Sequence, residues 1–203
     1  MTNAKDHGRQ IIVLASGNKG KLHELQDALA PAGLTLRNQS DHGVTEAVED
    51  GATFVENAIK KARNACQQTG YPALADDSGL VVPALGGTPG IHSARYSGEG
   101  DSGNNQKLLA AMQGLAGEER SAYFVCVLVL LQSATDPSPL IVEARWHGHI
   151  GLAPKGANGF GYDPLFLVTD KDGLTAAELA LEQKRAISHR GRAVAMLRAK
   201  LGC

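Results

Sequence analysis

The chain has 203 residues, of which 43% are hydrophobic, so it is long enough to bury one sizeable core. Acidic and basic residues nearly cancel, to a formal net charge of -1, which excludes the overall positive field that favours duplex DNA or an anionic membrane. The three cysteines lie far apart and lack the spacing of a zinc site, which indicates free thiols in a reducing compartment. We therefore expect a cytoplasmic protein that binds any anion through a local cluster of residues.

The N-terminal part of the chain predicts a β-loop-α-β unit behind a loose tail. Residues 1–10 are polar and lack the apolar stretch of a signal peptide, so we expect a flexible N-terminal tail. Residues 11–15 form an apolar, β-branched run that predicts a buried strand. A helix over about residues 21–30 and a second strand over residues 34–37 should follow.

The next part of the chain carries a helix signal and two short strands. Residues 53–56 have the Thr-x-x-Glu form of a capping box, and apolar residues recur at helical spacing behind it. Residues 73–75 and 80–82 predict two short strands that flank a polar turn. Residues 86–103 predict a long glycine-rich loop, and a helix should follow over residues 107–112.

The remaining elements complete an α/β protein. Residues 124–131 and 141–150 predict the two longest strands, which turn-forming residues join into an antiparallel hairpin. Residues 165–168 add a strand, and a last helix should cover residues 188–201 with a serine cap. We therefore expect a mixed sheet with flanking helices in a single domain over residues 11–203.

The first candidate site lies where the first strand gives way to a helix, in the segment Ser16, Gly17, Asn18, Lys19, Gly20 and Lys21. Small residues let backbone amides approach an anion, while the helix N-terminus and two lysines add positive charge, so this segment suits phosphate. It differs from a P-loop, which has four residues between its glycines and a Ser or Thr after its lysine. A turn with solvated lysines is the alternative interpretation.

The second candidate site is a pair of adjacent acids, Asp76 and Asp77, followed by Ser78. Neighbouring carboxylates commonly raise one pKa or hold a hard cation, and a serine hydroxyl beside them can contact a phosphate. Acids within residues 46–50, among them Glu49, are placed to complete a magnesium site. The alternative is a simple turn, because Asp, Ser and Gly are also residue types that favour turns.

The third candidate site contains two aromatic residues, Phe160 and Tyr162, which alternate with glycines such as Gly161 and precede Asp163. Alternate residues of an extended segment face the same way, so the two rings are expected to form two walls of a slot for a flat base. The same pattern would also suit the start of a strand that packs into the core.

The fourth candidate site is the basic segment 184–192, which contains Lys184, His189 and Arg190. Lysine and arginine are pure hydrogen-bond donors and histidine can donate, so this segment could bind purine carbonyls or phosphate. A solvated basic helix end is the ordinary alternative.

Taken together and in this order, the four segments resemble the inosine/xanthosine triphosphate pyrophosphatases, the house-cleaning enzymes for deaminated purine nucleotides. The resemblance covers nearly the whole chain after residue 10 and rests on short motifs at residues 15–21, 53–58, 75–80, 86–90, 93–96, 160–164 and 188–191. It implies a long twisted mixed sheet whose flanking helices form two lobes around a central nucleotide cleft, in a homodimer. The family often has Thr where this chain has Ser16, a change that keeps the hydroxyl group.

The resemblance also implies a role for each candidate residue. Residues 16–21 and Ser78 would bind the triphosphate, and Asp77 would be the general base and a Mg²⁺ ligand, with Glu49 as its acidic partner. The residues that would bind the base are Phe160, Gly161, Tyr162, Asp163, Lys184, His189 and Arg190. In this scheme the two aromatic rings sandwich the base and the basic side chains reach its edge.

The implied activity is the hydrolysis of ITP, dITP and XTP to the monophosphate and pyrophosphate. Hypoxanthine and xanthine present a carbonyl at position 6, whereas adenine presents an amino group there, so buried donors should reject ATP. The alternative is a non-catalytic purine-nucleotide sensor or binding protein. Asp76, Asp77 and Glu49 argue against it, because a pure polyanion binder gains nothing from carboxylates beside phosphates unless a metal is held there.

Overall fold

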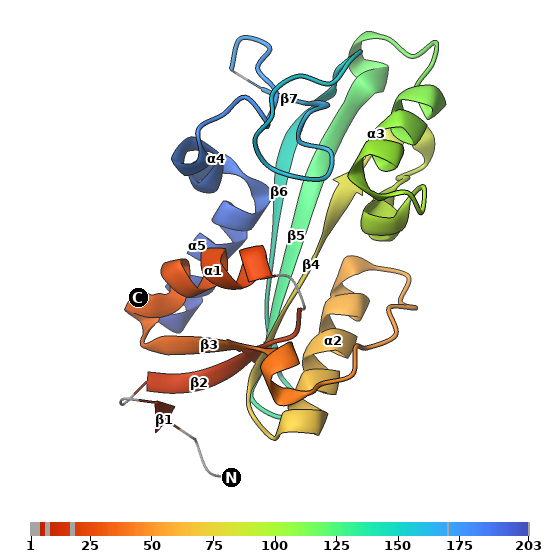
Figure 1. Cartoon of the computed structure of the whole chain (residues 1–203). Helices are drawn as coiled ribbons and strands as arrows, with labels where there is room; N and C mark the ends of the chain where they lie inside the picture. The colour runs from red at the N-terminus through yellow and green to blue at the C-terminus, as the bar shows by residue number, and fades with distance from the viewer. Residues whose placement is uncertain (1–4, 7–8, 17–18, 170, 203) are drawn as a thin grey trace. The chain divides into compact units, whose positions relative to one another are not determined.

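The computed structural model of the chain describes residues 5–6, 9–16, 19–169 and 171–202. The strands among these residues are β1 (Lys5–Asp6), β2 (Arg9–Leu14), β3 (Leu34–Asn38), β4 (Ala73–Val81), β5 (Ser121–Leu131), β6 (Leu140–Ile150) and β7 (Phe166–Val168). They form a seven-stranded sheet in the order β1-β2-β4-β5-β6-β7, with β3 paired to β2 (Figure 1). Parallel pairs join β2 to β3 and β4, and antiparallel pairs join β1 to β2 and β6 to β7, so the predicted mixed sheet is confirmed.

Five α-helices flank the described strands, as the predicted α/β class requires. They are α1 (Lys19–Leu29), α2 (Phe54–Thr69), α3 (Gly100–Ala111), α4 (Leu181–Ile187) and α5 (His189–Leu201). Short 3-10 helices lie between the longer elements, at Ala30–Ala32, Gln39–His42, Pro83–Leu85, Gly90–Arg95 and Gly117–Arg120. The four predicted helices are therefore present, and α4 is a further helix for which no range was predicted.

The chain divides into two compact units, and neither unit is one continuous segment. The first unit contains Met1–Asp77, Val127–Glu143 and Ala193–Cys203, and the second contains Ser78–Cys126 and Ala144–Arg192. Strands β4, β5 and β6 contribute residues to both units, because each crosses a boundary between them. The division of the chain into a tail and a single domain over residues 11–203 stays a prediction.

Strand β2 forms the centre of the first unit because its residues are apolar on both faces. Ile12, Val13 and Leu14 are almost completely buried. The strand pairs in parallel with β3, where Ile12 lies opposite Leu36, and with β4, where Leu14 lies opposite Leu74. A strand paired on both edges and covered on both faces needs a continuous hydrophobic run, and β2 has one.

The start of the chain differs from the predicted loose tail at the residues that the structure describes. Lys5 and Asp6 form β1, which pairs antiparallel with Arg9 and Gln10 at the start of β2. The remaining residues of the segment 1–10 lie outside the described part of the chain. The backbone pairing of these two strands accounts for the difference, because polar side chains on an edge strand do not prevent ladder hydrogen bonds.

Helix α2 begins with the capping box that the sequence predicts. The Thr53 hydroxyl accepts a hydrogen bond from the Glu56 backbone N–H at 3.2 Å, and the Glu56 carboxylate accepts one from the Thr53 N–H at 2.9 Å. The helix ends at Gly70, whose φ of 72° is in the left-handed region. Both ends of α2 are therefore fixed by local sequence.

The two short strands predicted on either side of residues 76–79 are wrong, since β4 runs without a break from Ala73 to Val81. Its neighbours in the sheet are β2, which pairs with Ala73 and Leu74 at its start, and β5 along its other edge. This pairing outweighs the local turn preference of Asp-Asp-Ser-Gly. As a result, Asp76 and Asp77 lie inside a buried strand, with side chains on opposite faces of the sheet.

The glycine-rich segment 86–103 was predicted to be a loop, but it contains regular structure. A 3-10 helix covers Gly90–Arg95, and α3 begins at Gly100, well before the predicted start at residue 107. Buried Asn104 holds the segment together, since its amide oxygen accepts hydrogen bonds from the Ser97 N–H at 2.7 Å and the Ser97 hydroxyl at 2.8 Å. Side-chain hydrogen bonds therefore stabilise this segment, whereas the prediction used the hydrophobic pattern of the sequence.

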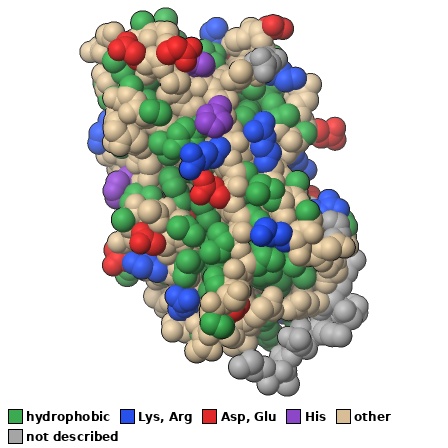
Figure 2. Space-filling model, turned by 180° about the vertical axis from the view of Figure 1, so that it is seen from behind, with side chains coloured by type: hydrophobic (Ala, Val, Ile, Leu, Met, Phe, Trp, Pro, Cys, Tyr) green, Lys and Arg blue, Asp and Glu red, His purple; other side chains and the backbone are tan. Residues whose placement is uncertain are grey.

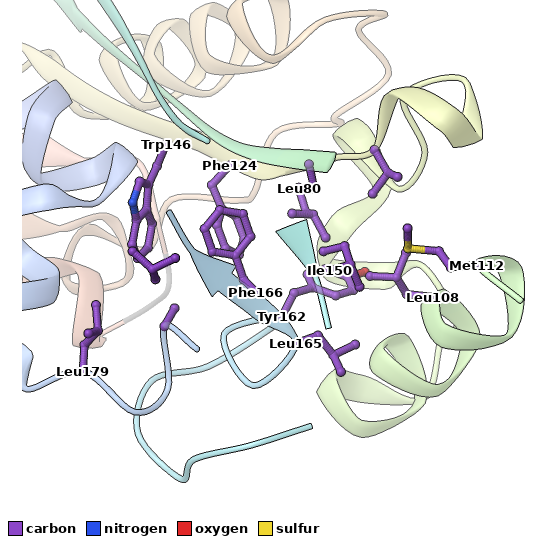
Figure 3. Close-up of a cluster of buried hydrophobic side chains, with 14 residues drawn as sticks. Leu80, Leu108, Met112, Phe124, Trp146, Ile150, Tyr162, Leu165, Phe166 and Leu179 are labelled. Atoms are coloured by element: carbon purple, nitrogen blue, oxygen red, sulfur yellow. The ribbon is translucent and has the colours of Figure 1, made fainter. Parts of the chain in front are cut away.

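A hydrophobic cluster forms the core of the second unit (Figure 3). Phe124 and Phe166 pack with ring centroids 4.6 Å apart, and Trp146 lies 5.0 Å from Phe166. The other labelled members are Leu80, Leu108, Met112, Ile150, Tyr162, Leu165 and Leu179. Strands β4, β5, β6 and β7 and helix α3 all supply residues to this core, which therefore joins segments far apart in sequence.

Charged side chains of both signs are interspersed on the face of the molecule drawn in Figure 2, in line with the small net charge. Within the described ranges, none of the helices has the length and apolar character needed to span a bilayer.

A buried arginine fixes the backbone around the second unit's core. The Arg120 guanidinium donates hydrogen bonds to the carbonyl oxygens of Ile150 at 2.7 Å, Gly151 at 2.7 Å, Met112 at 3.1 Å and Leu115 at 3.3 Å. Its side chain thus ties the end of β6 to the end of α3. The five N–H groups of a guanidinium suit this role, which a lysine could not fill.

We expect Arg120→Met to lower the free energy of unfolding by at least about 2 kcal/mol, because each buried carbonyl left without a donor costs about 1–3 kcal/mol. Urea denaturation followed by circular dichroism measures the change. Arg37→Met, at an exposed position on β3, is the control and should shift stability by less than about 0.5 kcal/mol. Equal midpoints for the two variants would contradict the assignment.

Candidate functional site

The predicted phosphate segment lies between β2 and α1, as the sequence indicates. Strand β2 ends at Leu14 and α1 begins at Lys19. Gly17 and Asn18 lie outside the described residues, and so does the side chain of Lys19. The strand-to-helix turn is therefore confirmed at its two flanks, and the contribution of its central residues stays a prediction.

Lys21 extends from α1 to the acidic part of β4. Its Nζ atom donates a hydrogen bond to Asp76 Oδ1 at 2.6 Å. The Asp76 side chain is fully buried and that of Lys21 is 20% exposed. A buried carboxylate needs a charged or hydrogen-bonding partner, and Lys21 supplies both, so the first turn of α1 is held to β4 by this ion pair.

Asp77 is paired with a second lysine, Lys61 of helix α2. Lys61 Nζ donates to Asp77 Oδ1 at 2.6 Å and to the backbone carbonyl of Asp76 at 3.0 Å. The same ammonium group lies 3.4 Å from Glu49 Oε1. Lys61 therefore lies beside both Glu49 and Asp77, and the prediction that these two acids share a metal ion stays a prediction.

The surroundings of Asp77 shift its protonation equilibrium. Burial raises the pKa of the Asp77 carboxyl above its ordinary value, and the Lys61 charge opposes that rise. Burial alone would lower the pKa of Lys61, but Asp77, Glu49 and Asp76 raise it above its ordinary value. Lys61 consequently remains charged at neutral pH and favours the ionised form of Asp77.

Asp77 has a second carboxylate oxygen that makes no internal contact of this kind. Its Oδ2 atom is buried and has no hydrogen-bond partner within the described residues. A buried acceptor without a donor is uncommon in proteins and normally has an explanation, such as a bound ion, a water molecule or a role in catalysis. This atom is the part of the cluster best suited to act on a ligand.

Sequence reasoning missed Lys61, although a signal for it was present. The buried face of α2 includes Ala58, Ala62 and Ala65. Lys61 follows Ala58 by three residues and precedes Ala65 by four, which places it on the same helical face. A charged residue at a position that the helical period assigns to the interior indicates a buried partner for that charge.

The two aromatic residues of the third segment do not form a slot. Phe160 is 54% exposed, whereas Tyr162 is 3% exposed and belongs to the core of the second unit. The Tyr162 hydroxyl donates to the backbone carbonyl of Ser93 at 2.9 Å. The prediction assumed an extended segment, but Gly159 and Gly161 have φ angles of 80° and 62°, so the chain turns here and the side chains point apart.

Phe160 has charged side chains around its ring instead. Lys184 Nζ lies 5.1 Å and Arg190 Cζ 5.7 Å from the ring centroid. Lys184 also donates a short hydrogen bond to Asp163 Oδ2, and that oxygen accepts another from the Phe160 backbone N–H at 2.9 Å. Phe160, Asp163, Lys184 and Arg190, predicted from two separate segments, are thus brought together in the second unit.

His189 lies at the start of α5 with its ring stacked on aromatic residues. Its ring centroid is 4.8 Å from that of Phe124, with an angle of 14° between the planes, and 6.4 Å from that of Trp146. The predicted serine cap is present, since Ser188 Oγ accepts a hydrogen bond from the Gly191 N–H at 3.1 Å. The imidazole is therefore held in one orientation by packing and by the helix start.

Gly191 allows the two C-terminal helices to approach one another closely. A Cβ atom at this position would overlap the backbone carbonyl of Arg185 in α4. The glycine of the motif at residues 188–191 thus has a packing role. Ser78 lies in β4 next to Asp77 and is half-buried, and its contact with a phosphate stays a prediction.

We expect Lys61→Met to raise the pKa of Asp77 further, because the substitution removes the charge that opposes the effect of burial. Titration of the carboxyl carbon by ¹³C NMR, assigned with Asp77→Asn, measures the shift. Lys60→Met is the matched control on the same helix, since Lys60 pairs with exposed Asp50 at 2.5 Å. An Asp77 pKa that Lys61→Met leaves in place would contradict the coupling.

Comparison with known proteins agrees with this arrangement along nearly the whole chain. Residues 12–200 match the Ham1 family. The chain is 55% identical to a dITP/XTP pyrophosphatase of Yersinia pseudotuberculosis over 190 residues, covering 93% of this chain and 96% of the relative. A dITP/XTP pyrophosphatase of Escherichia coli is 54% identical over the same length and the same shares of the two chains.

Solved structures give the same result. A HAM1 protein from Coxiella burnetii superimposes with a TM-score of 0.89 at 47% identity, covering 95% of this chain and 98% of the other. The Staphylococcus aureus Ham1 protein superimposes with a TM-score of 0.85 at 37% identity, with the same coverage. On these matches in sequence and fold, the chain belongs to the Ham1 family.

Proposed function

We propose that the protein is a nucleoside triphosphate pyrophosphohydrolase that converts ITP, dITP and XTP to the monophosphate and pyrophosphate. Relatives more than 50% identical over most of the chain carry the name dITP/XTP pyrophosphatase, which supports both the reaction and the substrate class. Within the cell this reaction removes deaminated purines from the nucleotide pool.

The buried charge cluster of the first unit is the observation that carries the proposal. Lys21 and Lys61 supply cations for a polyphosphate, and Asp77 Oδ2 is a buried carboxylate oxygen without a hydrogen bond in the described structure. Phosphoryl transfer depends mainly on charge neutralisation and on the positioning of a nucleophile. The cations from α1 and α2, together with a suitably placed base on the buried strand β4, meet both needs.

Asp77 is the general base of the proposed reaction. Its Oδ2 atom accepts a proton from water as the water oxygen forms a bond to the α-phosphorus. The bond between that phosphorus and the oxygen that bridges to the β-phosphorus breaks, and pyrophosphate leaves with the bonding electron pair. Lys61 keeps Asp77 ionised and oriented through Oδ1, which leaves Oδ2 for the proton.

Asp77 and Glu49 fit a hard divalent cation, for which we propose Mg²⁺. Both carboxylates lie beside the same ammonium group, and oxygen donors are the ligands that Mg²⁺ prefers. Groups of three or more His, Cys, Asp or Glu that could hold a metal do not occur in the described ranges, so water and substrate oxygens would supply the other ligands. The bound cation would neutralise charge on the phosphates.

Phe160, Lys184, His189 and Arg190 form the proposed recognition site for the base, in the second unit. The exposed Phe160 ring offers one stacking face, so we propose a single aromatic wall in place of the sandwich expected from the sequence. Asp163 balances the charge of Lys184, which leaves the ammonium group able to donate its remaining N–H groups.

This donor set favours purines with an oxygen at position 6. Lys184 and Arg190 carry only donors, and a 6-carbonyl is an acceptor that they can satisfy. The 6-amino group of adenine would leave buried donors unpaired, which costs about 1–3 kcal/mol for each group. Discrimination against ATP is therefore a consequence of the residues around Phe160.

Two further properties belong to the proposal. A homodimer is expected from the resemblance to the family. We also propose a cytoplasmic location, and the buried Cys66, which forms no disulfide within the described residues, agrees with it, because reducing conditions keep thiols from forming disulfides. Burial raises the pKa of the Cys66 thiol to about 11, which makes it unreactive at neutral pH.

The decisive experiment measures pyrophosphate release from ITP, XTP, dITP, GTP and ATP with Mg²⁺ and with EDTA. We expect turnover of ITP, dITP and XTP only with the metal ion, and Asp77→Asn should lower kcat by roughly 100-fold or more, as loss of a general base does. Asp50→Asn is the control, because Asp50 is an exposed acid paired with Lys60.

Three outcomes would contradict parts of this proposal. Equal rates on ATP and ITP would show that the protein does not discriminate between a carbonyl and an amino group at position 6 of the base. Full turnover by Asp77→Asn would remove Asp77 from catalysis. Tight nucleotide binding without any release of pyrophosphate would instead favour the nucleotide-binding protein considered as the alternative.

Lys184→Met tests base recognition separately. The variant should raise KM for ITP by roughly tenfold while changing the much weaker activity on ATP little, because it removes a donor to the 6-carbonyl. Steady-state kinetics on the two nucleotides measures the ratio. Lys155→Met, at an exposed position in the segment between β6 and β7, should leave the ratio unchanged.

A further inference from the structure

Phe160 lies in a long connection that lacks strands and helices of its own. The connection runs from the end of β6 at Ile150 to the start of β7 at Phe166, and residues 152–160 are exposed. Loops of this kind are mobile unless side-chain hydrogen bonds hold their backbone. A stacking face for a base therefore requires contacts that fix the backbone around Phe160.

Two residues of α3 hold the peptide groups directly after Phe160. Asp101 Oδ2 accepts a hydrogen bond from the Gly161 backbone N–H at 2.6 Å. Asn105 Nδ2 donates to the Gly161 carbonyl at 2.8 Å and also to the Asp101 carbonyl at 2.9 Å. We refer to Asp101 and Asn105 together as the α3 clamp, since they bind both backbone groups of one glycine.

The α3 clamp acts together with a hydrogen bond inside the connection between β6 and β7. The Phe160 N–H donates to Asp163 Oδ2 at 2.9 Å, and the next N–H along the chain, that of Gly161, donates to Asp101. Two carboxylates therefore accept consecutive backbone N–H groups. Because Gly161 has a φ of 62°, its backbone is in a region that other residues rarely adopt, and the clamp stabilises this conformation.

Asn105 also carries an energetic penalty at its position. Its Oδ1 atom is buried and has no hydrogen-bond partner within the described residues. A buried amide oxygen without a donor is destabilising, so an apolar side chain would be the better choice for stability alone. The contact of Nδ2 with Gly161 is the compensating interaction, and its effect falls on the backbone next to Phe160.

We propose that Asp101 and Asn105 are positioning residues for base recognition, which fix the Phe160 ring as a stacking face through the Gly161 peptide groups. The inference rests on the proposed function, because it assigns the α3 clamp to the nucleotide base. Neither residue belongs to the segments in which the sequence indicated a site. Their role is to limit the orientations of Phe160, so that a base meets a ring already in place.

Variants of the two clamp residues, among them the near-isosteric Asn105→Asp and Asp101→Asn, separate the hydrogen bonds of the clamp from its packing. Asn105→Asp replaces the Nδ2 donor with an acceptor that faces the Gly161 carbonyl. Asp101→Ala removes the acceptor for the Gly161 N–H, whereas Asp101→Asn keeps an oxygen there and should restore the contact. Gln106→Ala, at an exposed position of the same helix, is the control.

We expect Asn105→Asp and Asp101→Ala to raise KM for ITP by roughly tenfold, with kcat within about twofold, since stacking of a base on an aromatic ring has an effect of this size. Asp101→Asn and Gln106→Ala should resemble the unmodified protein. Inhibition by inorganic tripolyphosphate, which has no base, should be the same for all five proteins. Thermal melting of each protein confirms that it is folded.

Calorimetric titration with IMP gives a measurement that does not require turnover, and both loss variants should bind IMP more weakly. If the unmodified protein releases no pyrophosphate from any nucleotide, the proposed function fails, and the IMP affinities still test the clamp. Unchanged KM and unchanged IMP affinity in both folded loss variants would overturn the inference. Equal weakening of tripolyphosphate and ITP would also overturn it, because that result indicates a general structural role.

Discussion

The structure depends on the placement of two carboxylates in the interior of a buried strand. Asp76 and Asp77 lie within β4, and burial of an unpaired charge would destabilise the fold by several kcal/mol. Lys21 from α1 and Lys61 from α2 each pair with one of them. The two helices therefore do more than cover hydrophobic residues, since each also delivers a cation to the strand. The same requirement that stabilises the first unit also assembles the proposed phosphate site.

In the second unit, the proposed recognition of the base depends on the contacts that hold Phe160 in place. The side chain proposed to meet the base, Phe160, is exposed, while the groups that hold it are buried or bonded to backbone. Asp163 has two partners in this arrangement, because one of its carboxylate oxygens accepts hydrogen bonds from both the Phe160 N–H and Lys184. Charge balance, backbone conformation and the position of a donor toward the base thus all depend on a single buried acid.

The sequence predicts the elements of this fold better than the directions of its side chains. Capping residues such as Thr53 and the apolar run of β2 determine local structure directly, so those predictions are confirmed. Tyr162 was misplaced because positive φ angles at glycines break the alternation of an extended chain. The predicted Asp-Asp-Ser-Gly turn is wrong because β4 continues through these residues as part of the sheet, which outweighs their local preference. Lys61 and Asn105 act across long sequence separations; the helical position of Lys61 indicates a buried partner, but no local pattern identifies that partner as Asp77.

The order of the two units along the chain has a consequence for how the protein folds during synthesis. The first unit needs Ala193–Cys203, which is made after the other segments of that unit, and the second unit needs Ala144–Arg192. Neither unit has all its residues until most of the polypeptide has been made. Contacts between such distant segments slow folding, since loop closure must precede the stabilising interactions. The apolar strand β2 is synthesised long before helix α5, and apolar segments that lack their partners are prone to aggregation during folding.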